Sequence, residues 1–372
     1  MTVSVALFNN KGGVGKTTLT YHLAHMFQRL GHRVLAVDLD PQSNLTAAFL
    51  DEEELAVLWA EPESPAWGGA SSALSESPIR RVTGRSGTVA ASVRPIMEGL
   101  GDVAFYAPIQ IMDGLWLTPG DLELSAFEDR LSAAWPNCVM GDPAAIRTTT
   151  AFFRIIDDAA RRVRADLVLI DVGPNLGAIN RAALLTADTV LMPLAADLFS
   201  LRGLRNLGPT LRSWRAMWQR DLRPKVPPSI SAPSGAMRPL GYVIMQPTMR
   251  LDRPVKAYQR WLERIPTIFN GSVLGDPVPA DSGRSYEIAT LRNYQSLMPL
   301  AHDARKPMFD LRAADGALGS TQAYVQKCRA EFRVLAENVL RRIDEVKSPG
   351  SEPNPGDESA GSSGGEPLPR RL

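Results

Sequence analysis

A glycine-rich stretch near the start of the chain contains the residue types that bind phosphate groups. It follows the apolar run TVSVALF at 2–8, and it reads Lys11-Gly12-Gly13-Val14-Gly15-Lys16-Thr17. Glycines let backbone N–H groups approach an anion closely, and the lysine and threonine supply a cation and a hydroxyl. The generic pattern G-x-x-x-x-G-K-S/T fails here, because Asn10 stands where its first glycine belongs. The stretch therefore predicts a phosphate loop of an unusual kind.

The two lysines of this loop predict two different roles. Lys16 is placed to meet the β- and γ-phosphates of a nucleotide, and the Thr17 hydroxyl can ligate Mg²⁺. Lys11 has no role in a phosphate loop that works within one subunit, but a long cation there can reach a phosphate bound by a second subunit. A dinucleotide-binding loop fits less well, because the third glycine of G-x-G-x-x-G is absent. Only seven of the 41 basic residues are lysine, which makes this pair conspicuous.

The elements around the loop must form a strand–helix–strand unit. A buried strand is predicted at 2–8, a helix follows the loop as far as Leu30, and RVLAVD at 33–38 reads as a second strand. Such a unit implies a parallel sheet.

The rest of the chain continues this alternation. Further strands are predicted at 115–117, 166–171, 189–195 and 241–246, and helices at 121–134, 144–165, 176–186, 199–218, 253–263 and 321–347. Residues 51–100 carry DEEE and then Ser, Gly and Pro, so we expect a divergent insertion or loop there. From Ser348 the composition predicts a disordered tail, 348–372. We therefore predict one α/β domain at 1–347 with a doubly wound, mostly parallel sheet flanked by helices.

Three motifs of the sequence resemble those of the ParA/MinD family of deviant Walker ATPases. The loop matches the family's KGGxGK(S/T) signature in full, and Asp38-Leu39-Asp40-Pro41-Gln42 matches its DxDPQ motif. LVLIDVGPNLG at 167–177 is similar to its Walker B segment, although Val172-Gly173-Pro174 replaces the usual threonine and two prolines. The likeness covers roughly 1–50 and 100–345.

The resemblance implies a P-loop ATPase that forms a homodimer around two ATP molecules. Lys11 is then the lysine that crosses to the partner's nucleotide, and Asp40 positions or activates the attacking water. Thr17, Asp40 and Asp171 form the Mg²⁺ site, with Asp171 acting through water. The loop as far as Thr18 holds the phosphates, and weaker similarity places base contacts at Gln246, Pro279 and Asp281. The alternative for the acids is that they only cap turns at strand ends.

Charge is distributed unevenly along the chain, although the formal net charge is only +1. Residues 201–264 carry 13 basic and three acidic side chains, whereas 34–79 carry nine acids and neither Lys nor Arg. Arginines interspersed with tryptophan suit contacts to a DNA phosphate backbone without base readout. The candidates are Arg205, Arg212, Arg215 and, from the family resemblance, Arg250. The alternative is a solvated arginine face.

The cysteines and the lengths of the apolar runs indicate where in the cell the protein is expected. Cys138 and Cys328 cannot form a disulfide framework or a four-cysteine zinc site, so we expect buried thiols in a reducing compartment. No apolar run approaches the roughly 20 residues that span a bilayer, and the ending GGEPLPRRL forms no amphipathic helix. We expect a cytoplasmic protein that does not bind membrane, and nucleoid association if it binds DNA.

Two functions of different classes remain. The first is an ATP-dependent ATPase that binds DNA non-specifically and partitions or positions a cargo, with hydrolysis stimulated by a ParB-like adaptor or another partner linked to the cargo. The second is a regulatory or scaffold ATPase that binds a partner protein without DNA. A metabolic P-loop kinase is disfavoured by Lys11 and by the lack of a visible motif for a second substrate.

Overall fold

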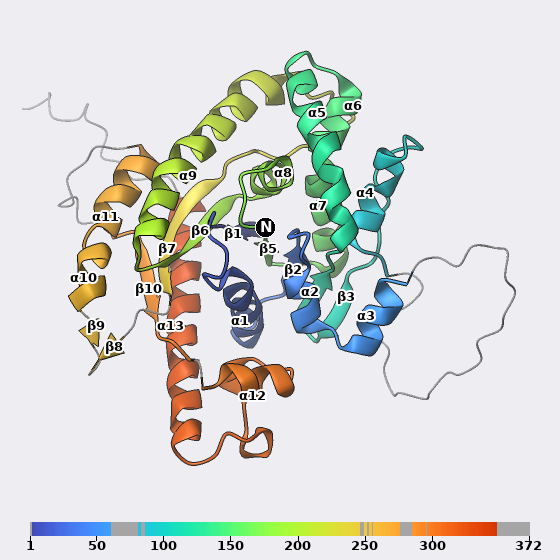
Figure 1. The fold of residues 1–372 in the computed structure, drawn as a ribbon. Helices are drawn as coiled ribbons and strands as arrows, with labels where there is room; N and C mark the ends of the chain where they lie inside the picture. The colour runs from blue at the N-terminus through green and yellow to red at the C-terminus, as the bar shows by residue number, and fades with distance from the viewer. Residues whose placement is uncertain are drawn as a thin grey trace, which may run out of the picture.

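Eight strands form a central sheet in the order β10-β7-β6-β1-β5-β2-β4-β3 (Figure 1). The structure is a computed structural model that describes residues 2–60, 81–82, 86–245, 249–250, 253–254, 256–275, 285–294 and 296–347. The strands are β1 (Val3–Leu7), β2 (Val34–Asp38), β3 (Ile109–Met112), β4 (Leu115–Thr118), β5 (Leu167–Asp171), β6 (Thr189–Ala195), β7 (Arg238–Met245) and β10 (Glu287–Leu291). All pairings are parallel except that of β3 with β4. A separate two-stranded sheet pairs β8 (Met249–Arg250) with β9 (Arg253–Pro254).

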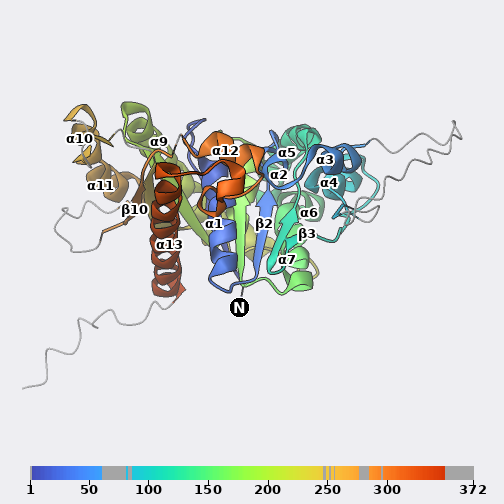
Figure 2. The same ribbon diagram turned by 90° about the horizontal axis from the view of Figure 1, so that it is seen from below.

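Helices cover both faces of the sheet, which is why its central strands are apolar throughout. Every residue of β1, β2 and β5 is buried, as expected for parallel strands packed on two sides. One core includes α1 (Lys16–Arg29), α2 (Asn44–Phe49), α12 (Met298–Asp303) and α13 (Ser320–Lys347). Three of these, α1, α12 and α13, lie toward the viewer in Figure 2.

The opposite face is covered by a larger set of helices. They are α4 (Val89–Met97), α5 (Phe127–Val139), α6 (Pro143–Thr149), α7 (Ala151–Val163), α8 (Ala178–Thr186), α9 (Leu198–Met217) and α11 (Ile265–Ile268). Two further helices, α3 (Glu52–Leu58) and α10 (Lys256–Leu262), lie at the periphery of the fold. The predicted doubly wound α/β class is therefore confirmed.

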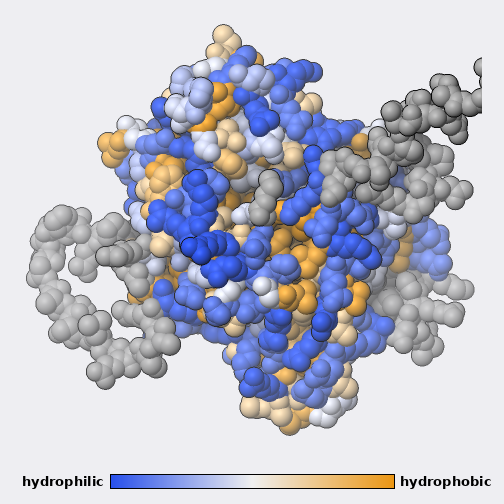
Figure 3. Space-filling model, turned by 180° about the vertical axis from the view of Figure 1, so that it is seen from behind, coloured by the Kyte–Doolittle hydropathy of each residue, from blue (hydrophilic) through white to orange (hydrophobic). Residues whose placement is uncertain are grey.

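The face of the molecule seen in Figure 3 is largely hydrophilic. On the face shown in Figure 3, hydrophobic residues gather in a central band bordered by hydrophilic ones. Among the described residues, we find no helix that is long and apolar enough to span a bilayer.

Of the insertion or loop expected at 51–100, the loop is wrong at both ends, where the structure has the helices α3 and α4, and the insertion stays a prediction. Asp51 caps α3: its carboxylate accepts a hydrogen bond from the Glu54 N–H at 2.8 Å, and the Glu54 carboxylate accepts one from the Asp51 N–H at 3.0 Å. At α4, the Thr88 hydroxyl accepts a single capping hydrogen bond from the Ala91 N–H at 3.1 Å. The acidic run thus begins a helix, where carboxylates are favourable. Residues 61–80 and 83–85 lie outside the described residues.

Other predicted boundaries need smaller corrections. The helix predicted at 144–165 is two helices that meet at Thr150, whose hydroxyl donates to the Ile146 carbonyl at 2.8 Å. The helix predicted at 121–134 starts as a 3₁₀ turn, Leu122–Ala126, and continues as α5 to Val139. Both cysteines are buried free thiols, as predicted. The tail at 348–372 lies outside the described residues, and the domain boundary at 347 stays a prediction.

Candidate functional site

The phosphate loop connects β1 to α1 at the carboxyl edge of the sheet. Gly13 and Gly15 have φ values of +72° and +94°, a conformation that side chains other than glycine rarely adopt. Gly15 is the N-cap of α1, and it has no side chain to occupy the N–H groups of the first helical turn. These donors and the helix dipole are therefore available to an anion in the loop.

Lys16 is turned back into the loop. Its side chain is buried, and its ammonium donates a hydrogen bond to the Lys11 carbonyl at 3.3 Å. Burial lowers the pKa of Lys16, and attraction to Asp171 and Asp40 opposes this shift. A desolvated ammonium next to the backbone N–H groups of the loop is well placed to neutralise a bound phosphate.

Asp171 ends β5 beside the start of α1. Its carboxylate accepts hydrogen bonds from the hydroxyls of Thr17, at 2.7 Å, and Thr20, at 3.3 Å. In the sheet register Asp171 is paired with Leu7 on one side and Asp38 on the other. The predicted metal ligands Thr17 and Asp171 are therefore in direct contact.

Asp38 organises the loop that carries Asp40. Asp38 is fully buried, and its carboxylate accepts hydrogen bonds from the Thr46 N–H at 2.8 Å, the Thr46 hydroxyl at 2.7 Å and the Asp40 N–H at 3.2 Å. The Thr46 hydroxyl in turn accepts one from the Gly120 N–H at 2.8 Å. Asp40 accepts a hydrogen bond from the Gln42 N–H at 3.0 Å. This network fixes Asp40 relative to the sheet.

Three acids, Asp38, Asp40 and Asp171, lie close to one cation, Lys16, in this region. Burial raises the pKa of both Asp38 and Asp171, and repulsion between neighbouring carboxylates raises it further. A hydroxyl and carboxylates grouped in this way are hard oxygen donors, which Mg²⁺ prefers. The residues present therefore fit a divalent cation held by Thr17 and Asp171 with Asp40 nearby.

A cavity of about 780 Å³ lies over this loop, within the usual size range for ligand sites. Its walls include Gly12, Lys16, Thr17 and Asp40, and it continues along α1 to α12. Most of the predicted phosphate-binding residues of the loop and Asp40 thus line one cavity, whereas Lys11 and Val14 do not.

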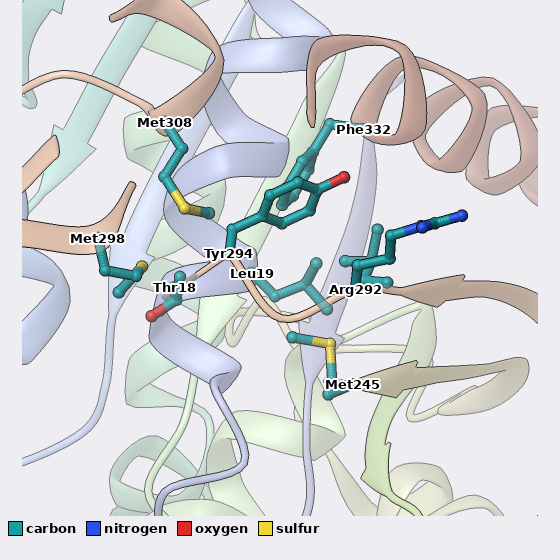
Figure 4. A pocket seen from close by; sticks show the side chains of 9 residues that line it. Thr18, Leu19, Met245, Arg292, Tyr294, Met298, Met308 and Phe332 are labelled. Atoms are coloured by element: carbon teal, nitrogen blue, oxygen red, sulfur yellow. The ribbon is translucent and has the colours of Figure 1, made fainter. Parts of the chain in front are cut away.

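A second, much smaller cavity of about 20 Å³ lies beside α1, where β7 and β10 end (Figure 4). Its lining includes Thr18, Met245 and Tyr294, and its volume is that of about one water. Met245 directly precedes Gln246, one of the predicted base contacts. Gln246, Pro279 and Asp281 themselves lie outside the described residues, so the base contacts stay predictions.

Lys11 points away from the loop and contacts a residue that the sequence analysis missed. Its ammonium forms an ion pair with Asp197, 186 positions along the chain, and lies 5.8 Å from the centre of the Phe199 ring. Asp197 follows β6 and caps α9, accepting a hydrogen bond from the Ser200 N–H at 2.8 Å. An acid at a strand-to-helix junction is a recognisable cap signal, but the pairing of Asp197 with Lys11 cannot be read from the sequence.

The predicted DNA-contacting arginines differ in their surroundings. Arg205 on α9 is exposed, whereas Arg215 is partly buried and its pKa is lowered by burial and by Arg212. The Arg212 guanidinium donates a hydrogen bond to the Ser272 carbonyl, so this side chain also ties α9 to the π-helical turn Phe269–Leu274. The side chain of Arg250 lies outside the described residues. Exposure thus favours Arg205 most clearly as a phosphate contact.

The parallel sheet, the loop between β1 and α1 and the acids at the ends of β2 and β5 define a P-loop ATPase. A family described as an AAA domain matches residues 2–223. With the KGGxGK(S/T) signature in place, the chain belongs to the ParA/MinD family of P-loop ATPases.

Similar proteins include partition ATPases. The chromosome-partitioning ATPase Soj of Thermus thermophilus is 31% identical over 212 residues, which are 57% of this chain and 62% of Soj. The chain thus spans less than two thirds of Soj. Protein DIP2308 of Corynebacterium diphtheriae shares the fold with a TM-score of 0.62 and 25% identity, over 92% of this chain and 98% of that one. A putative plasmid partition protein of Borrelia burgdorferi, bound to AMPPNP, shares the fold with a TM-score of 0.55 and 15% identity, over 93% of this chain and 99% of that one. That last likeness concerns the fold alone.

Replacing Gly120 by alanine should destabilise the Asp38 network. An added Cβ would lie 2.9 Å from the Asp38 carboxyl carbon and 3.0 Å from the Ser43 hydroxyl. We expect a loss of about 1–3 kcal/mol in the free energy of unfolding, measured by urea denaturation.

Gly101→Ala is the matched control. A Cβ there meets none of the described atoms within 4 Å, so its effect should stay within about 0.5 kcal/mol. Equal stability of the two variants would show that Gly120 is not held against the Asp38 network.

Proposed function

We propose that this protein is an ATPase that dimerises around ATP, binds DNA non-specifically, and drives the partition or positioning of DNA or another cargo. The observation that carries the proposal is the different surroundings of two loop lysines. The Lys16 ammonium folds back onto the loop, whereas the Lys11 ammonium lies outside it, paired with Asp197 at the start of α9. An outward lysine is of use to a phosphate that lies outside its own subunit, as in the dimers of this family.

Within one subunit, the chain's own groups bind and position the triphosphate. Backbone N–H groups of Gly12, Gly13, Val14 and Gly15 surround the phosphates, with Thr18 in the first turn of α1, and Lys16 neutralises the β- and γ-phosphates. Thr17 and Asp171 would hold Mg²⁺, with Asp40 nearby. When bound, Mg²⁺ supplies positive charge to the transferred phosphoryl group.

Asp40 is the group that positions the attacking water. It lies in the cavity over the loop, and the network from Asp38 through Thr46 holds its backbone in place. Because phosphoryl transfer depends mainly on positioning and charge neutralisation, this arrangement suffices for slow intrinsic hydrolysis. A partner protein would accelerate it, as a ParB-like adaptor does in partition systems of the family.

The similarity to Soj, a chromosome-partitioning ATPase, supports chromosome partitioning as one such role. Binding to DNA would rest on the arginines of α9, chiefly Arg205 and Arg215, with Arg212 and Arg250 as further candidates. A dimer would then contact DNA through two α9 helices, one from each subunit. Such binding would concentrate the protein on the nucleoid.

The Lys16→Ala variant should lose nucleotide binding. Removing a buried cation from the phosphates is expected to weaken ATP binding at least about 30-fold, which isothermal titration calorimetry with ATP and Mg²⁺ can measure. Binding at the wild-type affinity by a folded variant would exclude the phosphate site proposed here.

Asp40→Ala should separate binding from hydrolysis. The variant is expected to bind ATP but to hydrolyse it about 100-fold more slowly, and so to accumulate as an ATP-bound dimer. Phosphate release and light scattering after size exclusion report the two properties. Hydrolysis at the wild-type rate would show that the role assigned to Asp40 is wrong.

DNA binding can be tested on α9 by its dependence on salt. The double variant Arg205→Ala and Arg215→Ala should lower the slope of log affinity against log salt by about two, measured by fluorescence anisotropy with ATP. Arg212 is left intact because its loss would also remove the hydrogen bond to Ser272.

Arg333→Ala is the control for this measurement, because Arg333 is an exposed arginine on α13 that pairs with Glu337. Its slope should equal that of the wild type. An unchanged slope in the double variant would exclude α9 as the DNA surface. If the wild-type protein bound no DNA with ATP at low salt, the regulatory or scaffold function would be favoured instead.

A further inference from the structure

The ion pair between Lys11 and Asp197 occupies the lysine that is proposed to act on a second subunit. The two side chains come from the phosphate loop and from the start of α9, and they retain 33% and 30% of their exposure. Hydrogen bonds also hold both residues in place: the Lys11 N–H donates to the Asn9 side chain at 3.1 Å, and Asp197 caps α9. The contact therefore joins two ordered elements, yet stays within reach of solvent and of a second molecule.

The Asp197 side chain of this pair is an ionised carboxylate at neutral pH. Partial burial disfavours the Asp197 carboxylate, but hydrogen bonds from Lys11 and Ser200 outweigh this effect and lower the pKa of Asp197. The Lys11 ammonium thus has one carboxylate and one aromatic face as neighbours within its own subunit.

We propose that Asp197 is an autoinhibitory residue, which retains Lys11 within its own subunit and must release it before Lys11 reaches the nucleotide of a second copy of the chain. This inference rests on the proposed function, because it takes the crossing role of Lys11 as given. The free subunit is then held in a state that is less competent to dimerise. ATP favours the dimer because a triphosphate offers Lys11 more negative charge than one carboxylate does.

The free energy expected of the ion pair between Lys11 and Asp197 suits a weak restraint on dimerisation rather than a complete block. Half-exposed ion pairs contribute little to stability, because water screens both charges. Triphosphate oxygens in a closed dimer interface are better partners, since charge-assisted hydrogen bonds strengthen where water is excluded. The restraint would therefore suppress dimerisation without nucleotide and yield once ATP is bound.

The same contact links the nucleotide site to the arginine-bearing helix. Asp197 is both the partner of Lys11 and the N-cap of α9, and α9 carries Arg205, Arg212 and Arg215. Phe199 in the first turn of α9 is 69% exposed beside Lys11. A second copy that draws Lys11 away would therefore change the surroundings of the first turn of α9.

Asp197→Asn tests the inference cleanly, because asparagine is an equally good helix cap but has no charge to hold Lys11. The change is made in the Asp40→Ala protein, so that ATP is not consumed. The protein concentration that gives half dimer with ATP and Mg²⁺ is measured by analytical ultracentrifugation. We expect it to fall about two- to fivefold, and the difference to shrink at high salt.

Asp158→Asn in the same background is the matched control, because Asp158 forms a similarly half-exposed pair with Arg162 on α7. It should leave the half-dimer concentration unchanged. An Asp197→Asn protein that dimerises no more readily than its parent would overturn the autoinhibitory role.

A third variant separates this inference from the proposed function on which it rests. Lys11→Ala in the same background should fail to dimerise with ATP. If it dimerised as its parent does, the crossing role of Lys11 would be wrong, and the inference would fall with it. If it failed to dimerise while Asp197→Asn gained nothing, only the autoinhibition would be excluded.

Discussion

The parallel register of three neighbouring strands is the constraint on which the site depends. Leu7, Asp171 and Asp38 are aligned across β1, β5 and β2, so the phosphate loop and two acids emerge at the same edge of the sheet. Carboxyl ends of parallel strands always meet in this way, and here they carry a cationic loop next to buried acids. The cost of burying these carboxylates is offset by the threonine hydroxyls, by Lys16 and, in the proposed function, by Mg²⁺.

Each of these charged residues is held by a contact that comes from another part of the fold. Thr17 and Thr20 fix Asp171, Thr46 and Gly120 fix the Asp38 loop, and Asp197 fixes Lys11. The phosphate loop is therefore joined to β5 and to α9, and Asp40 on the loop after β2 lies close enough to attract the Lys16 ammonium. In the proposed function, a bound nucleotide would therefore affect three parts of the structure: the metal ligands, the residue that positions the attacking water, and α9 with its arginines.

The local parts of the site could be predicted from the sequence, because spacing alone specifies them. The glycine loop, Asp40 and Asp171 each belong to a short motif next to a strand. In the structure the loop and Asp40 line one cavity, and Asp171 lies buried beside Thr17. The contact of Lys11 with Asp197 could not be predicted, since it joins residues 186 positions apart. Composition was misleading at 51–59, where an acidic run begins a helix. The positive charge of Arg212 predicts a DNA contact, but the sequence does not reveal that its guanidinium donates a hydrogen bond to the Ser272 carbonyl.

The action of Lys11 on the nucleotide of a second subunit can be tested by the structure of the Asp40→Ala protein with ATP and Mg²⁺. We expect a two-fold symmetric dimer in which each Lys11 ammonium has left Asp197 and lies within hydrogen-bonding distance of the phosphates bound by the other subunit. A nucleotide-bound protein in which Lys11 still pairs with Asp197, or contacts only the phosphates of its own subunit, would contradict it.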